Sequence, residues 1–382
     1  MLDALDFLDD LTGMGLRNFF GVPDSLLSAL TQGIEARAAD GAFSLEITAN
    51  EGAAMGLAIG SYLATAEPAA VFLQNSGLGN LVNPLTSLAH PKVYSTPMLL
   101  IVGWRGEILD GEQVKDEPQH VFQGEITLKM LDLLEVPYQV IGPDMTRARA
   151  AETAAWLLSS AKTASKPTAL VIRKDSFFPA PKTEAPASAY PAREAAIAVA
   201  LSAIGSDTPI VATTGKISRE VYELRLRDSL PVPAFLTVGG MGHAAMIAAG
   251  LARERPGRKV ACFDGDGAVL MHAGSLATAA KADNLIHLVL NNQVHDSVGG
   301  HATAGPDLHL DAVARAFGYK AAVRITELAD IAPAIREAAA APCACFLEIM
   351  VAPGARAGLG RPKDHPAQAK AAFMRALDGS DD

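Results

Sequence analysis

Apolar and polar positions along this chain follow two alternating periodicities. Short apolar runs rich in β-branched residues are separated by longer stretches in which apolar residues recur at helical spacing. One of the longer stretches, residues 51–64, predicts a helix that begins at Glu51. Strands that alternate with helices in this way pair in parallel, because a parallel connection needs a crossover element. The pattern therefore predicts the α/β class, with doubly wound parallel sheets.

The predicted strands divide evenly between the two halves of the chain. In the first half they lie near 18–22, 44–48, 69–73, 98–103, 138–141 and 169–173. In the second half they lie near 209–212, 234–238, 259–264, 286–290, 321–325 and 345–351. We therefore expect two domains built on the same plan, although no residue-level repeat relates them.

A stretch with neither periodicity separates the halves. Residues 178–191 are rich in Pro, Ala and Ser, a composition typical of a linker. We expect a first domain at 1–178, a linker at 179–192, a second domain at 193–377 and a frayed tail at 378–382. A length of 382 residues suits two domains that each bury a core.

Composition and charge exclude several functional classes. The formal net charge is −10, which disfavours a nucleic-acid surface because phosphate backbones are bound by clustered Lys and Arg. Apolar runs are shorter than a membrane span, and residues 1–10 are acidic where an export signal would be basic. Cys262, Cys343 and Cys345 lie in apolar stretches that predict strands, so neither disulfides nor a Cys-based zinc site is expected. We expect a cytoplasmic enzyme without nucleic-acid or membrane partners.

The strongest local signal is a pair of polar motifs at the ends of two successive predicted strands. The sequence DGDG occupies 264–267, and NN occupies 291–292. Because parallel strands end at the same edge of a sheet, Asp266 and Asn292 are expected to lie together. Their oxygens suit Mg²⁺, which takes its remaining ligands from phosphates and water. The glycines let a diphosphate approach the backbone and the N-terminus of the next helix.

Two other classes of binding site share features with these motifs. A calcium-binding EF-hand loop is excluded, because Val269 and Ser275 stand where Gly and Glu are required. A dinucleotide site remains open, since residues 240–245 fit Gly-x-Gly-x-x-Ala and Asp264 could bind a ribose. This alternative, a nicotinamide-dependent oxidoreductase, leaves most of the two polar motifs without a role.

The segment from 265–267 to 291–292 matches the thiamine-diphosphate signature in residue type and spacing. Further stretches extend the likeness over nearly the whole chain: FFGVPDSLL (19–27), NEGAAMGLAIG (50–60), QNSGLGN (74–80), GWRGE (103–107), DEPQH (116–120), VATTGKISREVYELR (211–225), FLTVGGMGHA (235–244), MHAGSLAT (271–278) and LNNQVHDSVGG (290–300). In these stretches the chain resembles the phosphonopyruvate decarboxylases, which are thiamine-diphosphate-dependent 2-oxo-acid decarboxylases. Its linker is too short for the central domain of larger relatives, which fits the compact phosphonopyruvate and sulfopyruvate branch.

The resemblance implies a cofactor site of thiamine diphosphate with Mg²⁺. The side chains of Asp266 and Asn292 and the backbone carbonyl of Val294 would be the metal ligands. Met241 would be the apolar wedge that bends the cofactor, and Glu51 would hydrogen-bond N1′ of its aminopyrimidine. Other cofactor contacts would come from Thr214, Gly215, Gly239, Gly265, Gly267 and Ala268. Taken alone, Glu51 is more ordinarily a helix-start acid and Met241 a core residue.

The resemblance also implies the reaction, the non-oxidative decarboxylation of phosphonopyruvate to phosphonoacetaldehyde and CO₂. Sulfopyruvate is the alternative substrate. Asp24, His120 and His295 are the candidates for proton handling. An acidic protein that binds a small, strongly anionic 2-oxo acid needs cations in its cleft, and Arg105 and Lys115 are the candidates.

The resemblance finally implies an assembly. In this family the active site lies between the pyrimidine domain of one subunit and the diphosphate domain of another. A homodimer is therefore the smallest unit that we expect. A regulatory relative without enzymatic activity is disfavoured, because Glu51, Asp266 and Asn292 occur together.

Overall fold

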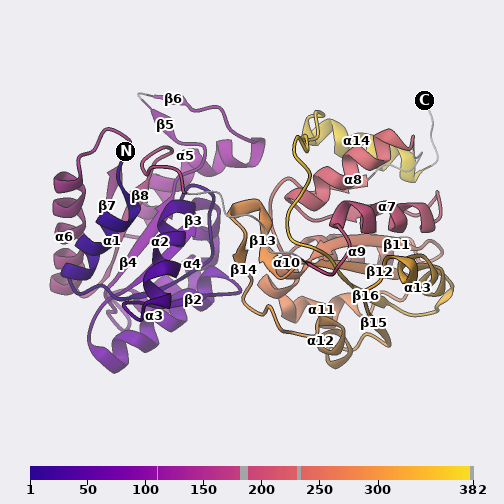
Figure 1. Cartoon of the computed structure of the whole chain (residues 1–382), viewed down its shortest axis with the longest axis horizontal. Coiled ribbons are helices and arrows are strands. Elements are labelled where there is room, and N and C mark those ends of the chain that lie inside the picture. The colour runs from indigo at the N-terminus through magenta and orange to yellow at the C-terminus, as the bar shows by residue number, and fades with distance from the viewer. Residues whose placement is uncertain (110, 181–187, 230–233, 379–382) are drawn as a thin grey trace. The chain divides into compact units, whose positions relative to one another are not determined.

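The computed structural model describes residues 1–109, 111–180, 188–229 and 234–378. The chain forms two compact units, Met1–Thr183 and Glu184–Asp382 (Figure 1). The predicted linker and tail lie partly outside the described residues. Within the described ranges, no helix has both the length and the apolar character needed to cross a membrane.

Unit 1 is built on a parallel sheet in the order β2-β1-β3-β4-β8-β7. Its strands are β1 Asn18–Gly21, β2 Ser44–Ile47, β3 Ala69–Gln74, β4 Met98–Gly103, β7 Tyr138–Ile141 and β8 Pro167–Ile172. Its helices are α1 Ala4–Gly13, α2 Ser28–Ala39, α3 Glu51–Thr65, α4 Leu78–Pro84, α5 Pro118–Leu133 and α6 Arg147–Ala164. A small hairpin joins β5 Ile108–Leu109 to β6 Glu112–Gln113.

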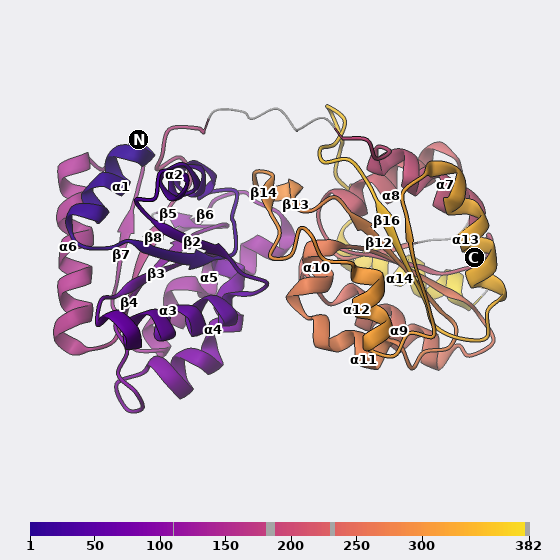
Figure 2. The same cartoon turned by 60° about the horizontal axis from the view of Figure 1, so that its bottom comes forward.

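Alternate residues of these strands enter two cores. Phe72 and Ile101 pack with α1, α2 and α6, whereas Val71 and Leu100 pack with α3, α4 and α5. Figure 2 shows α1 and α6 on one face of the sheet and α3 and α4 on the other. Burial on both faces explains why the central strands are uninterrupted apolar runs.

Unit 2 repeats this plan with the order β10-β9-β11-β12-β16-β15, again all parallel. Its strands are β9 Ile210–Ala212, β10 Ala234–Leu236, β11 Val260–Gly265, β12 Leu285–Asn291, β15 Ala321–Ile325 and β16 Cys345–Met350. Its helices are α7 Arg193–Ala203, α8 Lys216–Arg227, α9 Ala244–Glu254, α10 Asp266–Met271, α11 Leu276–Ala279, α12 Leu310–Ala316, α13 Leu328–Ala340 and α14 Pro366–Leu377. A hairpin of β13 Val294–His295 and β14 His301–Ala302 follows β12.

The two sheets have the same topology. Counted within each unit, the strands lie in the order second, first, third, fourth, sixth and fifth. The predicted α/β class with two doubly wound sheets is confirmed, and every predicted strand is present with ends within two residues. One detail was wrong: Cys343 is half-buried in the turn before β16 rather than inside a strand.

Candidate active site

In unit 1, polar side chains collect at the carboxyl ends of four neighbouring strands, β2, β1, β3 and β4. Glu51 follows β2, Asp24 follows β1, Gln74 ends β3 and Arg105 follows β4. This edge is where open α/β sheets bind ligands. The helix predicted to begin at Glu51 is α3, and Glu51 is its first residue.

Glu51 is a buried acid with a dedicated partner. Asn50 caps the helix by accepting a hydrogen bond from the Ala53 N–H at 3.0 Å, which fixes the position of the first helical residue. The Asn80 side-chain amide donates to Glu51 Oε2 at 2.7 Å. Burial raises the pKa of Glu51, and the hydrogen bond from Asn80 opposes the rise only in part. The carboxyl group therefore holds a proton to higher pH than an exposed glutamate does.

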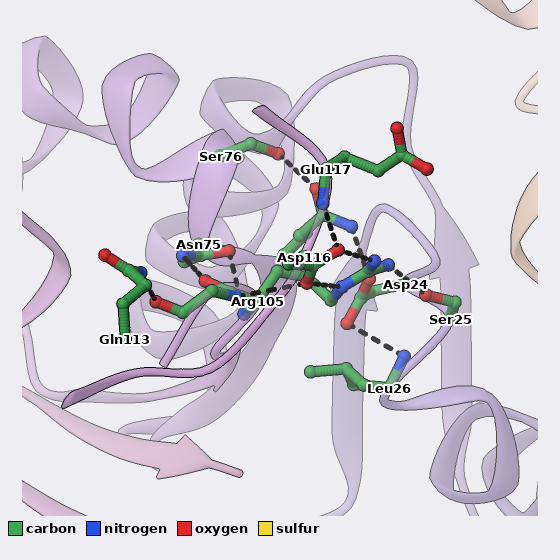
Figure 3. A network of polar contacts seen from close by, with 11 residues as sticks. Asp24, Ser25, Leu26, Asn75, Ser76, Arg105, Gln113, Asp116 and Glu117 are labelled. Carbon is green, nitrogen blue, oxygen red and sulfur yellow. Dashed lines mark hydrogen bonds and ion pairs between the residues drawn. The ribbon is translucent and has the colours of Figure 1, made fainter. Parts of the chain in front are cut away.

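Asp24, in the same unit, is fully buried and belongs to the polar network of Figure 3. The Gln74 amide donates to Oδ1 at 2.6 Å, and the Leu26 N–H donates to Oδ2 at 3.1 Å. Burial raises the pKa of Asp24, while the Gln74 hydrogen bond and the charge of Arg105 lower it by less. The carboxyl group of Asp24 therefore keeps its proton to higher pH than an exposed aspartate does.

Arg105 is anchored by a carboxylate. Its Nε and Nη2 donate to the two oxygens of Asp116 at 2.8 and 2.5 Å, and Nη1 donates to the Ser25 hydroxyl at 3.1 Å (Figure 3). Burial would raise the pKa of Asp116, but its hydrogen bonds with Arg105 and the Glu117 N–H lower the value to about 2. The guanidinium is therefore held beside Asp24 in one orientation.

The other two candidates of unit 1 differ in their surroundings. His120 has a pKa lowered by burial and by the charge of Arg105, so the imidazole is neutral near pH 7. Its Nδ1 is buried without a hydrogen-bond partner among the described residues. Lys115 is exposed, and its neighbour Asp116 is the residue that enters the network of Figure 3.

In unit 2, the candidates again follow four neighbouring strands, β10, β9, β11 and β12. Strands β11 and β12 are paired, with Gly265 opposite Leu290, so the two polar motifs meet as expected. Asp266 accepts hydrogen bonds from the Thr303 hydroxyl at 3.1 Å and from the backbone N–H groups of Gly267 and Asn292. Burial nevertheless raises the pKa of Asp266 to about 7.

The hairpin after β12 orients the two other proposed ligands. Val294 lies opposite Ala302, and its N–H donates to Asn292 Oδ1 at 3.3 Å instead of joining the hairpin ladder. In a strand the N–H and the C=O of one residue point to the same side. The Val294 carbonyl therefore faces the side on which Asn292 lies.

Close packing explains two of the predicted glycines. A Cβ on Gly267 would lie 2.8 Å from Cε1 of His295 and 3.3 Å from Cε of Met241. Gly215 is the N-cap of α8 and has a φ of +96°, and a Cβ there would lie 2.7 Å from the Ser297 hydroxyl oxygen. Side chains at either position would fill this edge. His295 lies in this packing, and burial together with the charge of His301 lowers its pKa to about 4.

The remaining predicted cofactor residues lie on the same edge. Thr214 follows β9, Gly239 follows β10, Gly265 ends β11, and Ala268 is buried in α10. Oxygen ligands, a buried carboxylate and glycine-lined backbone fit a Mg²⁺ ion that carries a diphosphate. A cation there would favour the charged form of Asp266 that burial disfavours.

The geometry disfavours the dinucleotide alternative. β10, which precedes the Gly-x-Gly segment, is an edge strand bonded to β9, and β11 lies beyond β9. Asp264 is buried, accepts a hydrogen bond from the Gly265 N–H at 2.9 Å and lies 3.4 Å from Nε2 of His287. It therefore cannot serve as a ribose-binding acid. Asp264, His287 and Cys262 form a buried group of potential metal ligands within the sheet, away from open solvent.

Several polar partners were missed from the sequence. Asn80, Gln74 and Asp116 lie within the stretches QNSGLGN and DEPQH that carry the resemblance, so a signal for them existed. Thr303 lies outside every such stretch. Its contact with Asp266 depends on the β13–β14 hairpin, which was not predicted.

Two protein-family models match the chain. Residues 5–132 match "Thiamine pyrophosphate enzyme, N-terminal TPP binding domain". Residues 213–349 match "Thiamine pyrophosphate enzyme, C-terminal TPP binding domain". Thiamine pyrophosphate is another name for thiamine diphosphate. The matched segments contain the polar edges of unit 1 and unit 2, respectively.

Similar curated proteins cover nearly the whole chain. A phosphonopyruvate decarboxylase from Streptomyces viridochromogenes is 38% identical over 390 residues, which cover 98% of this chain and 94% of the relative. Another from Streptomyces hygroscopicus is 37% identical over 390 residues, with coverages of 96% and 92%. A sulfopyruvate decarboxylase from Methanosarcina acetivorans is 26% identical over 352 residues, with coverages of 85% and 86%.

Proposed function

Since this chain belongs to the phosphonopyruvate decarboxylase family of thiamine-diphosphate enzymes, we propose that it converts phosphonopyruvate to phosphonoacetaldehyde and CO₂. The observation that carries the proposal is the identity of 37–38% to two phosphonopyruvate decarboxylases over nearly the full chain. The acids, amides and glycines at the two sheet edges support it, because they supply the groups that such a reaction needs.

Asp266, Asn292 and the Val294 carbonyl would hold Mg²⁺, and the ion would hold the diphosphate. When bound, thiamine diphosphate supplies the electron sink that decarboxylation of a 2-oxo acid requires. Met241 would be the apolar wedge of the cofactor site, and its closeness to Gly267 supports this role. The diphosphate site would be lined by Thr214, Gly215, Gly239, Gly265 and Ala268.

Glu51 would exchange a proton with N1′ of the aminopyrimidine. Its raised pKa supports this role, because the group must both hold and release a proton. Asn80 donates to Oε2, and Oε1 lies against Gly77, where a Cβ would clash with it.

Asp24 would deliver a proton to the substrate carbon that has lost CO₂. Its burial and raised pKa support this role, since a proton must be present on the acid before it can be delivered. His120 and His295 are the other candidates. Both have pKa values lowered by burial, so they are neutral and would act as hydrogen-bonding groups or bases.

Arg105 would bind the phosphonate group. Asp116 occupies Nε and Nη2, so Nη1, which donates to the Ser25 hydroxyl, is the group that could turn to the substrate. Lys115, which is exposed and precedes Asp116, would add positive charge. We further propose a homodimer as the minimum assembly, with sites formed by two subunits, and a cytoplasmic role in phosphonate biosynthesis.

The test compares three substrates on one preparation. Purified protein with thiamine diphosphate and Mg²⁺ is given phosphonopyruvate, sulfopyruvate or pyruvate, and kcat/KM for CO₂ release is measured. We expect phosphonopyruvate to have the highest value. The sulfopyruvate alternative rests on a likeness of lower identity and coverage. A higher kcat/KM for sulfopyruvate would replace the proposed substrate by that alternative.

A further inference from the structure

A carboxylate that is only 10% exposed, that of Asp296, lies next to the Asn292 side chain. Oδ2 of Asp296 accepts a hydrogen bond from Nδ2 of Asn292 at 2.8 Å and another from Nη1 of Arg193 at 2.5 Å. The backbone N–H of Gly354 donates to both oxygens of Asp296, at 3.0 and 3.1 Å. Four donor contacts thus fix one carboxylate in the loop that follows β12.

Arg193 belongs to a cluster that water scarcely reaches. It is the first residue of α7, and its side chain is 3% exposed, while that of Glu220 on α8 is 1% exposed. Nε and Nη2 of Arg193 donate to the two oxygens of Glu220 at 2.8 and 3.0 Å. One guanidinium therefore joins α7, α8 and the loop after β12.

Stability alone does not explain such a cluster. Removing two carboxylates and a guanidinium from water is expensive, and apolar residues of similar size often stabilise a core as well. The cluster is, however, hydrogen-bonded to Asn292, a predicted metal ligand. Residues that hydrogen-bond to metal ligands fix the orientation of those ligands and raise metal affinity.

The Asn292 amide has two different ends, and only one of them can bind a cation. Nδ2 donates to Asp296, whereas Oδ1 accepts the Val294 N–H. If the amide turned over, its oxygen would meet the Asp296 carboxylate oxygen, and both are acceptors. Asp296 therefore holds the oxygen of Asn292 on the side of Val294.

We propose that Asp296, fixed by Arg193, is a positioning residue that presents the Asn292 oxygen to the cation. The inference rests on the proposed function, because that function supplies the Mg²⁺ ion. Asp296 itself touches neither substrate nor cofactor in this account. Its effect passes through the orientation of Asn292.

The test measures cofactor binding without substrate. Metal-free Asp296→Ala and Asp296→Asn proteins are titrated with Mg²⁺ at fixed thiamine diphosphate, and binding is followed by calorimetry. We expect the Mg²⁺ concentration for half-maximal cofactor binding to rise about tenfold or more, as for other residues behind metal ligands. Excess Mg²⁺ should restore binding, which a general loosening of unit 2 would not allow. Asp296→Asn keeps the shape of the side chain and serves if Asp296→Ala does not fold.

Glu220→Gln is the matched control. It alters the same buried cluster through Arg193 but leaves the contact between Asp296 and Asn292 in place. We expect a lower melting temperature with an unchanged Mg²⁺ requirement. An equal rise in the Mg²⁺ requirement for Glu220→Gln and Asp296→Asn, or no rise for either Asp296 variant, overturns the inference. If the wild type itself bound no thiamine diphosphate with Mg²⁺, the proposed function would fail as well.

Discussion

Single acidic residues are central to the proposed chemistry, and burial changes their pKa values. The pKa of Asp24 lies above its ordinary value because burial outweighs the hydrogen bond from Gln74 and the charge of Arg105. Between the unfolded and the folded pKa, the folded protein binds more protons than the unfolded chain. The free energy of unfolding must therefore fall as pH rises through that window.

Asp24→Asn removes this titration. The contribution of the protonated acid is complete below the unfolded pKa of about 4 and is lost as pH rises through the folded value. We expect the variant to lack this decline. Its free energy of unfolding should therefore rise relative to that of the wild type as pH rises. Urea unfolding over a pH series measures the difference. Parallel pH profiles for the two proteins would show that the pKa of Asp24 is not raised.

Arg105→Lys tests substrate recognition at the same scale. Lysine cannot make the two parallel hydrogen bonds to Asp116, and it presents a point charge in place of a planar fork. We expect KM for phosphonopyruvate to rise by about tenfold or more, and KM for pyruvate to rise less, because pyruvate has no phosphonate. Lys115→Ala is measured beside it. A larger rise in KM for phosphonopyruvate in Lys115→Ala than in Arg105→Lys would identify Lys115 as the residue that binds the phosphonate.

Helices and strands were largely predictable because each depends on local pattern. Buried parallel strands are apolar on both faces, so their runs stand out in the sequence. The β5–β6 and β13–β14 hairpins were missed, since strands of two residues are too short to show a periodicity. The partners of the site residues were harder still, because no spacing rule joins Glu51 to Asn80 or Asp116 to Arg105.

The start of α3 links one element to the site. Asn50→Ala removes the helix cap and should lower the free energy of unfolding by about 1 kcal/mol. Turnover should fall by more than this loss of stability accounts for, because Glu51 directly follows Asn50. Thr146→Ala removes the cap of α6, where the hydroxyl accepts the Arg149 N–H at 3.3 Å, and provides the control. Urea unfolding and steady-state turnover are measured for both variants. Equal losses of turnover would show that the cap of α3 has no specific effect on the site.

At the scale of the whole molecule, two units of the same topology carry different chemistry. Unit 1 presents buried acids with amide partners, and unit 2 presents oxygen ligands and glycine-lined backbone. The shared topology could be inferred from the repeated pattern of runs. The proposed division of roles came instead from the resemblance of individual motifs to a known family, because it depends on a few side chains at strand ends.

The proposed assembly makes a prediction about mixtures. Glu51→Gln should bind cofactor but turn over about 10²–10⁴-fold more slowly, and Asp266→Ala should lose cofactor at ordinary Mg²⁺. If each site combines Glu51 of one subunit with Asp266 of another, mixed dimers contain one intact site. Subunit exchange between the variants should restore up to about a quarter of wild-type activity. A mixture as inactive as its components would place both residues of a site in one chain.

The central claim is tested most directly by following one reaction to its products. Metal-free protein is incubated with phosphonopyruvate, and phosphorus NMR and CO₂ release are recorded before and after thiamine diphosphate and Mg²⁺ are added. We predict that phosphonoacetaldehyde and CO₂ appear in equal amounts only when both additions are present. Persistence of phosphonopyruvate in the complete mixture, or its loss without thiamine diphosphate, would contradict the account.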